Sequence, residues 1–215
     1  MTDSIFLRAK HWQIFIPLIA IPFITMIIFS ILTAFVMVNN VPNRPEDVLW
    51  ITYLMPFIML LSASVQFGWF WNVLTKLSKL VPNEVRMPIK RMKLFFFIPL
   101  VYFCILPLFI GFVIRNTTND NLHPGTLINV VIAGIVIFFL HLFSMFCIFH
   151  TIYFVAKTIR SAEIQRNATF SDFTGDFFLI WFFPIGVWFI QPRINKLIQE
   201  SNGNLNQHQE LVDQI

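Results

Sequence analysis

Charged residues are scarce in this sequence of 215 residues. Only 12% of them are Asp, Glu, Lys or Arg, about half the roughly 25% that a soluble domain carries. Hydrophobic residues make up 57%, and 27 residues are Phe. A soluble fold of this length could not cover so much apolar surface. The composition therefore predicts that lipid surrounds most of the chain and excludes an ordinary soluble enzyme.

Cysteine is almost absent as well. The two cysteines, Cys104 and Cys147, both lie in apolar stretches, where a thiol behaves as a small hydrophobic group. Two such residues exclude a disulfide framework and a cysteine-based zinc site. No metal and no cofactor are predicted.

Five apolar runs contain no Asp, Glu, Lys or Arg. They cover residues 14–38, 49–73, 94–114, 127–156 and 177–190. The first four exceed the roughly 20 residues that a transmembrane helix needs. Prolines inside the first three runs predict kinked helices, and the fourth run, which has none, predicts the straightest one.

The fifth run is shorter, with 14 residues, and includes Pro184 and Gly186. This length fits a re-entrant or interfacial segment better than a span. We expect an all-α polytopic membrane helix bundle with four transmembrane helices and this short segment, which in the alternative is a fifth span. Residues 1–200 form one transmembrane domain, and the polar residues 201–215 are expected to be a flexible tail.

The basic residues predict an orientation. With the N-terminus in the cytoplasm and four spans, eleven Lys and Arg residues lie inside and two lie outside, Arg44 and Arg115. If the fifth run turns back, Arg193 and Lys196 join the inner group and the split becomes 13 to 2; if it crosses, the split is 11 to 4. The positive-inside rule favours the cytoplasmic N-terminus and the returning segment.

The loop between the second and third runs has an amphipathic pattern. Val85, Ile89 and Met92 share one helical face, and basic residues share another. This pattern predicts a short helix at the membrane surface. The candidate contacts to anionic lipid are Arg86, Lys90, Arg91, Lys93 and Arg193. The alternative is ordinary positive-inside topology with no specific lipid.

Groups that carry chemistry in membranes are missing. Carboxylates inside the runs would indicate an ion-coupled transporter, and there are none. The motifs G-x-S-x-G and H-E-x-x-H of hydrolases are also absent. Because Lys and Arg flank the apolar runs, they indicate membrane topology and not a nucleic-acid surface. The sequence therefore predicts a protein that is not an enzyme.

A few polar side chains remain inside the runs. The candidates for lining a cavity are Gln66, Asn72, His141 and His150, although polar groups in spans also serve as hydrogen bonds between helices. His141 and His150 are nine residues apart and face opposite sides of a helix, so they cannot share a metal. His11 and His150 could together ligate a haem; the alternative is that each bonds to a neighbouring helix.

The residues from Phe182 to Asn195, FFPIGVWFIQPRIN, are the most distinctive segment. Pro184 and Gly186 allow a sharp bend, Pro192 is expected to end the segment, and Arg193 falls where headgroup phosphates would lie. The segment resembles one that recurs in small multi-pass inner-membrane proteins of Bacteroidota. The resemblance implies a bacterial cytoplasmic (inner) membrane and no particular activity.

Three functional hypotheses follow. The first is a non-enzymatic integral membrane protein, an accessory or scaffold subunit that contacts the lipid bilayer and other membrane subunits. The second is a channel or carrier for a neutral or lipidic small molecule. The third is a haem-binding membrane protein.

Overall fold

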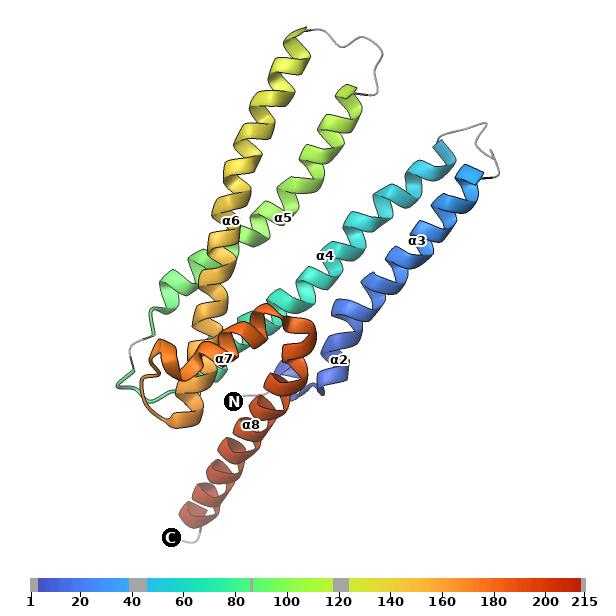
Figure 1. Ribbon diagram of the computed structural model, residues 1–215. Coiled ribbons are helices and arrows are strands. Elements are labelled where there is room, and N and C mark those ends of the chain that lie inside the picture. The colour runs from blue at the N-terminus through green and yellow to red at the C-terminus, as the bar shows by residue number, and fades with distance from the viewer. Residues whose placement is uncertain (1–3, 39–45, 86, 118–123, 214–215) are drawn as a thin grey trace. The chain divides into compact units, whose positions relative to one another are not determined.

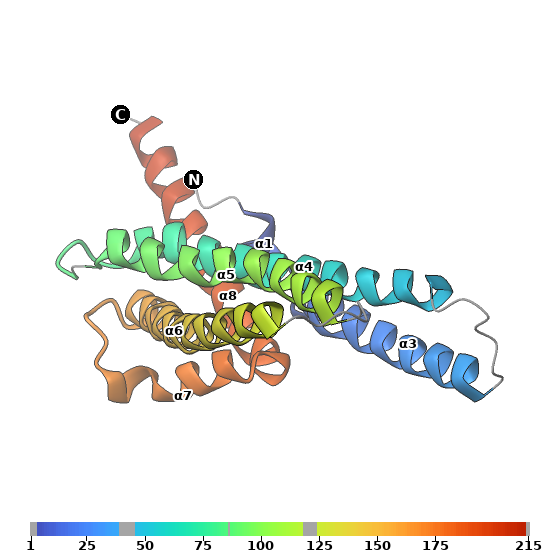
Figure 2. The same cartoon turned by 90° about the horizontal axis from the view of Figure 1, so that it is seen from above.

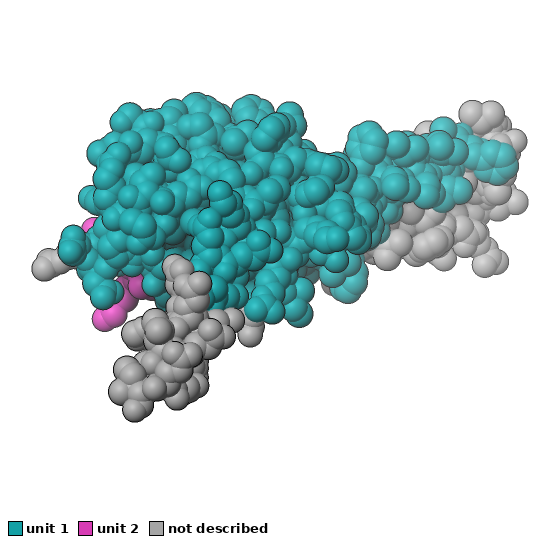
Figure 3. All heavy atoms as spheres, turned by 90° about the horizontal axis from the view of Figure 1, so that it is seen from below, with its two compact units in different colours: residues 1–87, 155–215 teal, residues 88–154 magenta. Residues whose placement is uncertain are grey.

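The computed structural model describes residues 4–38, 46–85, 87–117 and 124–213, and every regular element among them is a helix (Figure 1). The chain forms two compact units (Figure 3). Unit 1 combines Met1–Met87 with Val155–Ile215, and unit 2 is Pro88–Phe154. The prediction of an all-helical fold is confirmed.

Three helical stretches are long and apolar enough to cross a membrane. They are His11–Phe35, Ile89–Val113 and Ile128–Ile164. These ranges overlap the first, third and fourth apolar runs of the sequence. This is the architecture of a membrane protein, because helices satisfy their own backbone hydrogen bonds and so tolerate lipid.

The first part of unit 1 is a helical hairpin. Its first arm comprises α1 (Ile5–Arg8), α2 (His11–Phe15), the π-helix η1 (Ile16–Ala20) and α3 (Ile21–Val38). Its second arm is α4 (Glu46–Thr75), which lies beside α3 (Figures 1 and 2). The 3₁₀ turn η2 (Leu77–Leu80) follows.

The π-helical turn has a physical cause in Pro22, which follows it and whose i−4 residue, Leu18, lies within it. A proline in a helix has no N–H to donate, and its ring clashes with the carbonyl of the preceding turn. Widening that turn to a π-helix relieves the clash. The Ser62 hydroxyl of α4 donates to the Pro17 carbonyl oxygen at 3.1 Å, so α4 supports the turn.

The second part of unit 1 is the hairpin of α7 (Phe170–Trp181) and α8 (Phe183–Asp213). The chain reverses at Phe182, two residues before Pro184. Only glycine fits at position 186, because a Cβ there would collide with the backbone carbonyl of Leu179. The segment 177–190 therefore contains the end of α7 and the start of α8, joined by a turn at Phe182, and Pro184 and Gly186 lie in the first turn of α8.

The core of unit 1 brings distant parts of the chain together. Trp69 and Val73 of α4 are fully buried, as are Ile159 at the end of α6 and Ile190 and Ile194 of α8. The ring of Phe183 packs edge-on against Trp69, with centroids 5.2 Å apart. Burial of these large side chains stabilises this part of unit 1 through the hydrophobic effect. We call it the body of unit 1; it consists of α1, α2, the C-terminal end of α4, the end of α6, α7 and α8.

Unit 2 consists of α5 (Ile89–Thr117) and most of α6 (Pro124–Ile164). α5 contains Pro99 and Pro107, whereas α6 runs for 41 residues, with its only proline at the first position. The last ten residues of α6 belong to unit 1. α6 extends beyond the apolar run 127–156 through charged residues as far as Ile164.

Two local predictions were wrong. No separate surface helix occurs at residues 82–85 and 87–88; α5 begins at Ile89, directly after Pro88. Pro192 lies inside α8 and does not end it, since packing on both sides outweighs the missing hydrogen bond. Residues 201–213 continue α8 as a helix, and the flexibility of the polar tail stays a prediction. Thr169 caps α7.

Candidate functional site

Gln191 is the centre of a buried polar junction in unit 1. Its side-chain oxygen accepts a hydrogen bond from the Trp69 indole N–H at 2.8 Å. Its side-chain nitrogen lies 3.1 Å from the Phe6 carbonyl oxygen and 2.9 Å from that of Ala9. Asn195, one turn later, also donates to the Ala9 carbonyl. The amide thus joins α4, α8 and the link between α1 and α2.

The junction exists because the link between α1 and α2 leaves backbone carbonyls without helical partners. A buried carbonyl without a hydrogen bond costs about 1–3 kcal/mol. A fully buried glutamine at position 191 supplies both a donor for these carbonyls and an acceptor for Trp69. The arrangement fixes the N-terminal segment against the body of unit 1.

Arg193 forms a second polar cluster two residues later. Its guanidinium donates to both carboxylate oxygens of Glu163, at 2.6 Å each, and to the carboxylate of Asp176. Arg160 donates to Glu163 at 3.0 Å. These four residues, the Arg193 cluster, join the end of α6 to α7 and α8 and contain two positive and two negative side chains.

The electrostatics of the cluster follow from these bonds. Hydrogen bonds with Glu163 and Asp176 raise the pKa of the Arg193 guanidinium above its ordinary value, even though burial opposes this. Bidentate pairs between arginine and carboxylates are among the strongest in proteins. Arg193 therefore keeps its charge at all relevant pH values, and its guanidinium binds the carboxylates of both Glu163 and Asp176.

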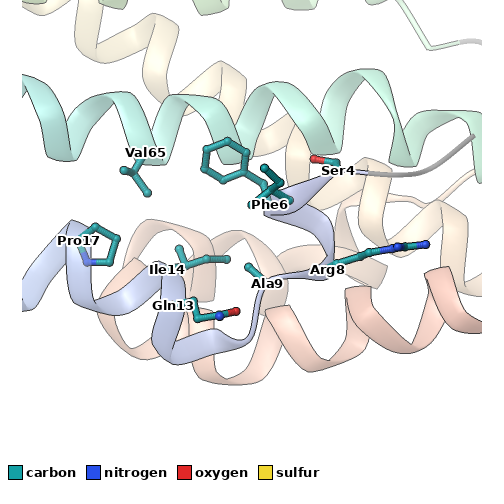
Figure 4. A pocket seen from close by; sticks show the side chains of 9 residues that line it. Ser4, Phe6, Arg8, Ala9, Gln13, Ile14, Pro17 and Val65 are labelled. Carbon is teal, nitrogen blue, oxygen red and sulfur yellow. The ribbon is translucent and has the colours of Figure 1, made fainter.

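A hollow of about 610 Å³ lies between the N-terminal segment and α4 (Figure 4). Ile14, Pro17 and Val65 line one end of this N-terminal hollow, and Ser4 and Arg8 lie at the other. The ring of Phe6 lines one side of the hollow, next to Gly68 of α4. All of its lining residues belong to unit 1.

No family model, curated protein or solved structure matches this chain. The indications of function therefore lie in its own residues and their geometry.

The α7–α8 hairpin carries an exposed apolar surface opposite its packed side. This aromatic face consists of Phe178, Trp181, Phe182, Ile185, Trp188 and Phe189, all exposed. On the inner side of the same hairpin, Phe173, Ile180 and Val187 are buried. An exposed apolar patch with two tryptophans is typical of a surface that meets lipid or another protein.

The predicted cavity residues of the second run lie in unit 1. Asn72 donates to the Gly68 carbonyl at 2.7 Å and accepts a hydrogen bond from Ser4 at 2.6 Å. The amide of Asn72 thus ties the N-terminus to α4. Gln66 is half-buried on the same helix. Neither residue lines the N-terminal hollow, and their role in a transport cavity stays a prediction.

The two histidines of the fourth run lie in unit 2. His141 Nδ1 is 2.8 Å from the Tyr102 hydroxyl, which links α6 to α5. His150 packs among aromatic rings, with Phe95 4.3 Å and Phe154 4.8 Å away between centroids. A cavity lined by these histidines stays a prediction.

His11, the other residue of the haem hypothesis, lies in unit 1. Its ring packs against Trp188, with centroids 4.3 Å apart. Within the described part of the chain, no group of three or more His, Cys, Asp or Glu side chains is arranged to hold a metal ion. Haem binding by His11 and His150 stays a prediction.

The predicted lipid-binding residues differ in their surroundings. Lys90, Arg91 and Lys93 are exposed in the first turns of α5, whereas Arg86 lies outside the described residues. Arg193 is held by the carboxylates of Glu163 and Asp176, which the sequence prediction missed. Contact of these residues with lipid stays a prediction.

Sequence reasoning also missed Trp69, Gln191, Glu163 and Asp176. Trp69 was one aromatic residue among many, and Gln191 was part of a segment noted only for its bend. Asp176 stands immediately before the fifth apolar run. A carboxylate beside an apolar run, with an arginine 17 residues later, was the only available signal for the Arg193 cluster.

Proposed function

We propose that this chain is a non-enzymatic integral membrane protein of a bacterial cytoplasmic membrane, serving as an accessory or scaffold subunit of a larger complex. In this proposal four transmembrane helices cross the membrane: α2–α3, α4, α5 and α6. The body of unit 1 lies at the cytoplasmic face.

The observation that carries the proposal is the way the body of unit 1 uses its polar groups. A catalyst presents acids, bases or nucleophiles to a cleft. Here Gln191 is bonded to Trp69 and to backbone carbonyls, and Arg193 is bonded to Glu163 and Asp176. These side chains are engaged in holding helices together, which is the chemistry of a scaffold.

The α7–α8 hairpin supports the placement at the membrane. From Phe183 to Ile190 the first part of α8 spans about 12 Å at 1.5 Å per residue. This is close to the roughly 15 Å depth of one leaflet of the hydrocarbon core. The aromatic face would thus enter the cytoplasmic leaflet without crossing the bilayer, and residues Arg193 and Lys196 return to the side of the other basic residues.

The end of α8 offers a surface for a partner. Residues 201–213 form a helix rich in Asn and Gln. A polar helix of this length is marginal in water by itself, so it gains from docking. Its backbone continues a helix that the body of unit 1 anchors through Ile190 and Ile194.

Affinity purification in mild detergent followed by native mass spectrometry tests the proposal. The full chain should retain another membrane protein in a fixed ratio. A chain that stops after Gly203 should lose that partner while the remaining residues keep their helix content and the chain elutes as a folded particle. Recovery of the full chain as a solitary, monodisperse monomer would count against the scaffold role.

Labelling from outside the cell tests the orientation separately. In a background without Cys104 and Cys147, a cysteine introduced by Lys90→Cys should resist a membrane-impermeant thiol reagent in intact cells and react after the membrane is opened. Reaction in intact cells would overturn the cytoplasmic placement.

A further inference from the structure

We propose that the N-terminal hollow binds one acyl chain of a phospholipid from the cytoplasmic leaflet, with the anionic headgroup at its Arg8 end. This inference rests on the membrane placement given above and adds a ligand to it. The hollow is the site, and the lipid is identified by the chemistry of the lining.

The two ends of the hollow differ in polarity. At one end lie Ile14, Pro17 and Val65, and the Pro17 carbonyl is already bonded by Ser62. Gln13, beside Ile14 in Figure 4, accepts a hydrogen bond from the Lys10 N–H. At the other end lie Ser4 and the exposed Arg8, whose side chain extends away from the apolar end in Figure 4. A ligand that fits has an apolar body and a polar, preferably anionic, tip.

The length of the hollow matches a leaflet. Ser4 is bonded to Asn72 of α4, and Pro17 is bonded to Ser62. Ten helical residues separate Asn72 from Ser62, which corresponds to about 15 Å along the axis. Half of the roughly 30 Å hydrocarbon core has the same depth. An acyl chain that starts at the Arg8 end therefore ends near the bilayer midplane.

The polar end lies toward the end of α4 that leads to Lys76 and Lys79. This is the side on which the positive-inside rule places the cytoplasm. The headgroup would accordingly sit at the inner surface, where Arg8 and Lys10 attract anionic lipid. The volume of about 610 Å³ is within the range of roughly 300–1,000 Å³ of small-molecule sites.

Phe6 and Gly68 set the width of the hollow. A Cβ at position 68 would approach the Phe6 ring to 2.8 Å, so any larger residue pushes the ring from its place. Glycine thus allows the far edge of the Phe6 ring to approach α4 closely, so that the ring forms one wall of the hollow. Moving that wall alters the space for the acyl chain.

The direct test is native mass spectrometry of the full chain released from mild detergent with added dioleoyl phosphatidylglycerol. The wild type should keep one lipid molecule. Val65→Trp, which fills the apolar end, should reduce this retention by about tenfold or more, because the indole displaces several buried methylenes. Unchanged retention by Val65→Trp, or no retained lipid in the wild type, would overturn the site.

Matched variants separate the hollow from the general lipid-facing surface. Leu61 lies one turn before Val65 on α4 and is exposed, so Leu61→Trp should keep the lipid. Gly68→Ala should weaken retention, whereas Gly175→Ala, with nothing within 4 Å of its Cβ, should not. Equal loss in Leu61→Trp and Val65→Trp would mean annular lipid only and would refute the proposal.

A comparison of two lipids tests the assignment of the anionic headgroup to Arg8. With phosphatidylcholine in place of phosphatidylglycerol, the wild type should retain several-fold less lipid, and Arg8→Gln should remove that difference. Equal retention of both lipids by the wild type would refute the assignment of the anionic headgroup to Arg8.

Photo-crosslinking serves where a variant does not fold. Phosphatidylglycerol with a diazirine in the acyl chain should label residues 5–17 and the α4 residues around Val65 in the wild type. Label confined to α5 and α6 would overturn the site. If Lys90→Cys labelling contradicts the cytoplasmic placement, the proposed topology fails; if that placement holds and the hollow stays unlabelled, only the lipid site fails.

Discussion

Different kinds of contact hold the helices together within each of the two units of this protein. In unit 1, charged and amide side chains bond across distant segments, as Arg193 does with Glu163 and Gln191 does with Trp69. In unit 2, the bond of Tyr102 and His141 is a polar link between α5 and α6, and aromatic rings provide further contacts. Because lipid gives apolar helices no hydrophobic reason to associate, a few polar and shape-specific contacts must define a pair of spans. Under the proposed placement of the body of unit 1 at the membrane surface, its helices also gain free energy by removing apolar side chains from water.

The largest effect should follow from Arg193→Met. The substitution leaves Glu163 and Asp176 without their main partner, and a buried carboxylate that loses its cation destabilises a fold by several kcal/mol. With Arg193 a third exposed, we expect about 2–4 kcal/mol, or roughly 5–10 °C in apparent melting temperature in detergent.

The control for Arg193 is Lys196→Met on the same helix. Lys196 pairs with Glu200 at 3.8 Å, and both side chains are exposed, so this variant should melt within about 1–2 °C of the wild type. Equal losses in the two variants would show that the Arg193 cluster has no special role.

Gln191→Leu should have the next largest effect. It removes the acceptor of the buried Trp69 indole, which is left without that partner, and one of the two donors to the Ala9 carbonyl, to which Asn195 still donates. The expected destabilisation is about 1–3 kcal/mol. Hydrogen exchange by mass spectrometry should show faster exchange in the N-terminal segment, whereas Gln199→Leu, at an exposed position, should leave it unchanged.

Tyr102→Phe tests unit 2 and should cost less. Hydrogen bonds between transmembrane helices contribute about 0.6 kcal/mol on average and no more than about 1.7 kcal/mol. In a double-mutant cycle with His141→Leu, the coupling free energy should fall in that range. A coupling as large as the effect of Arg193→Met would contradict the contrast between the two units.

The smallest effect concerns the start of α7. Asp172 accepts hydrogen bonds from the backbone N–H and hydroxyl of Thr169 and from Arg166, which lowers the pKa of its carboxyl from 3.8 to about 2. A lowered pKa means that the carboxylate's contribution to stability is complete above about pH 4 and is lost as the pH falls toward 2.

Carboxyl NMR of labelled aspartate in micelles checks this value. The Asp172 signal should titrate near pH 2 in the wild type and closer to its ordinary value in Thr169→Ala. Titration of the wild-type signal near pH 4 would refute the capping interaction.

Much of the fold was predictable from sequence because each prediction depended on local composition. An uncharged apolar run of more than 20 residues forms a helix in lipid whatever its neighbours are, as in α5 and α6. A turn within residues 177–190 was predictable because proline and glycine lie in that run. By contrast, the helical end of α8 and the passage of the helix through Pro192 depend on a helix nucleated and anchored elsewhere, which local propensity does not register.

The sequence by itself determined that helices form and where the apolar segments begin and end. It also determined which side of a membrane the basic residues beside those segments favour. Each of these properties depends on how a segment's own side chains are solvated. Only the tertiary structure decided that Gln191 meets Trp69, that Arg193 is held by Glu163 and Asp176, and that a hollow lies beside Val65. The contact between Gln191 and Trp69 joins residues 122 positions apart. The geometry of such contacts depends on how helices pack, and packing is a property of the assembled fold.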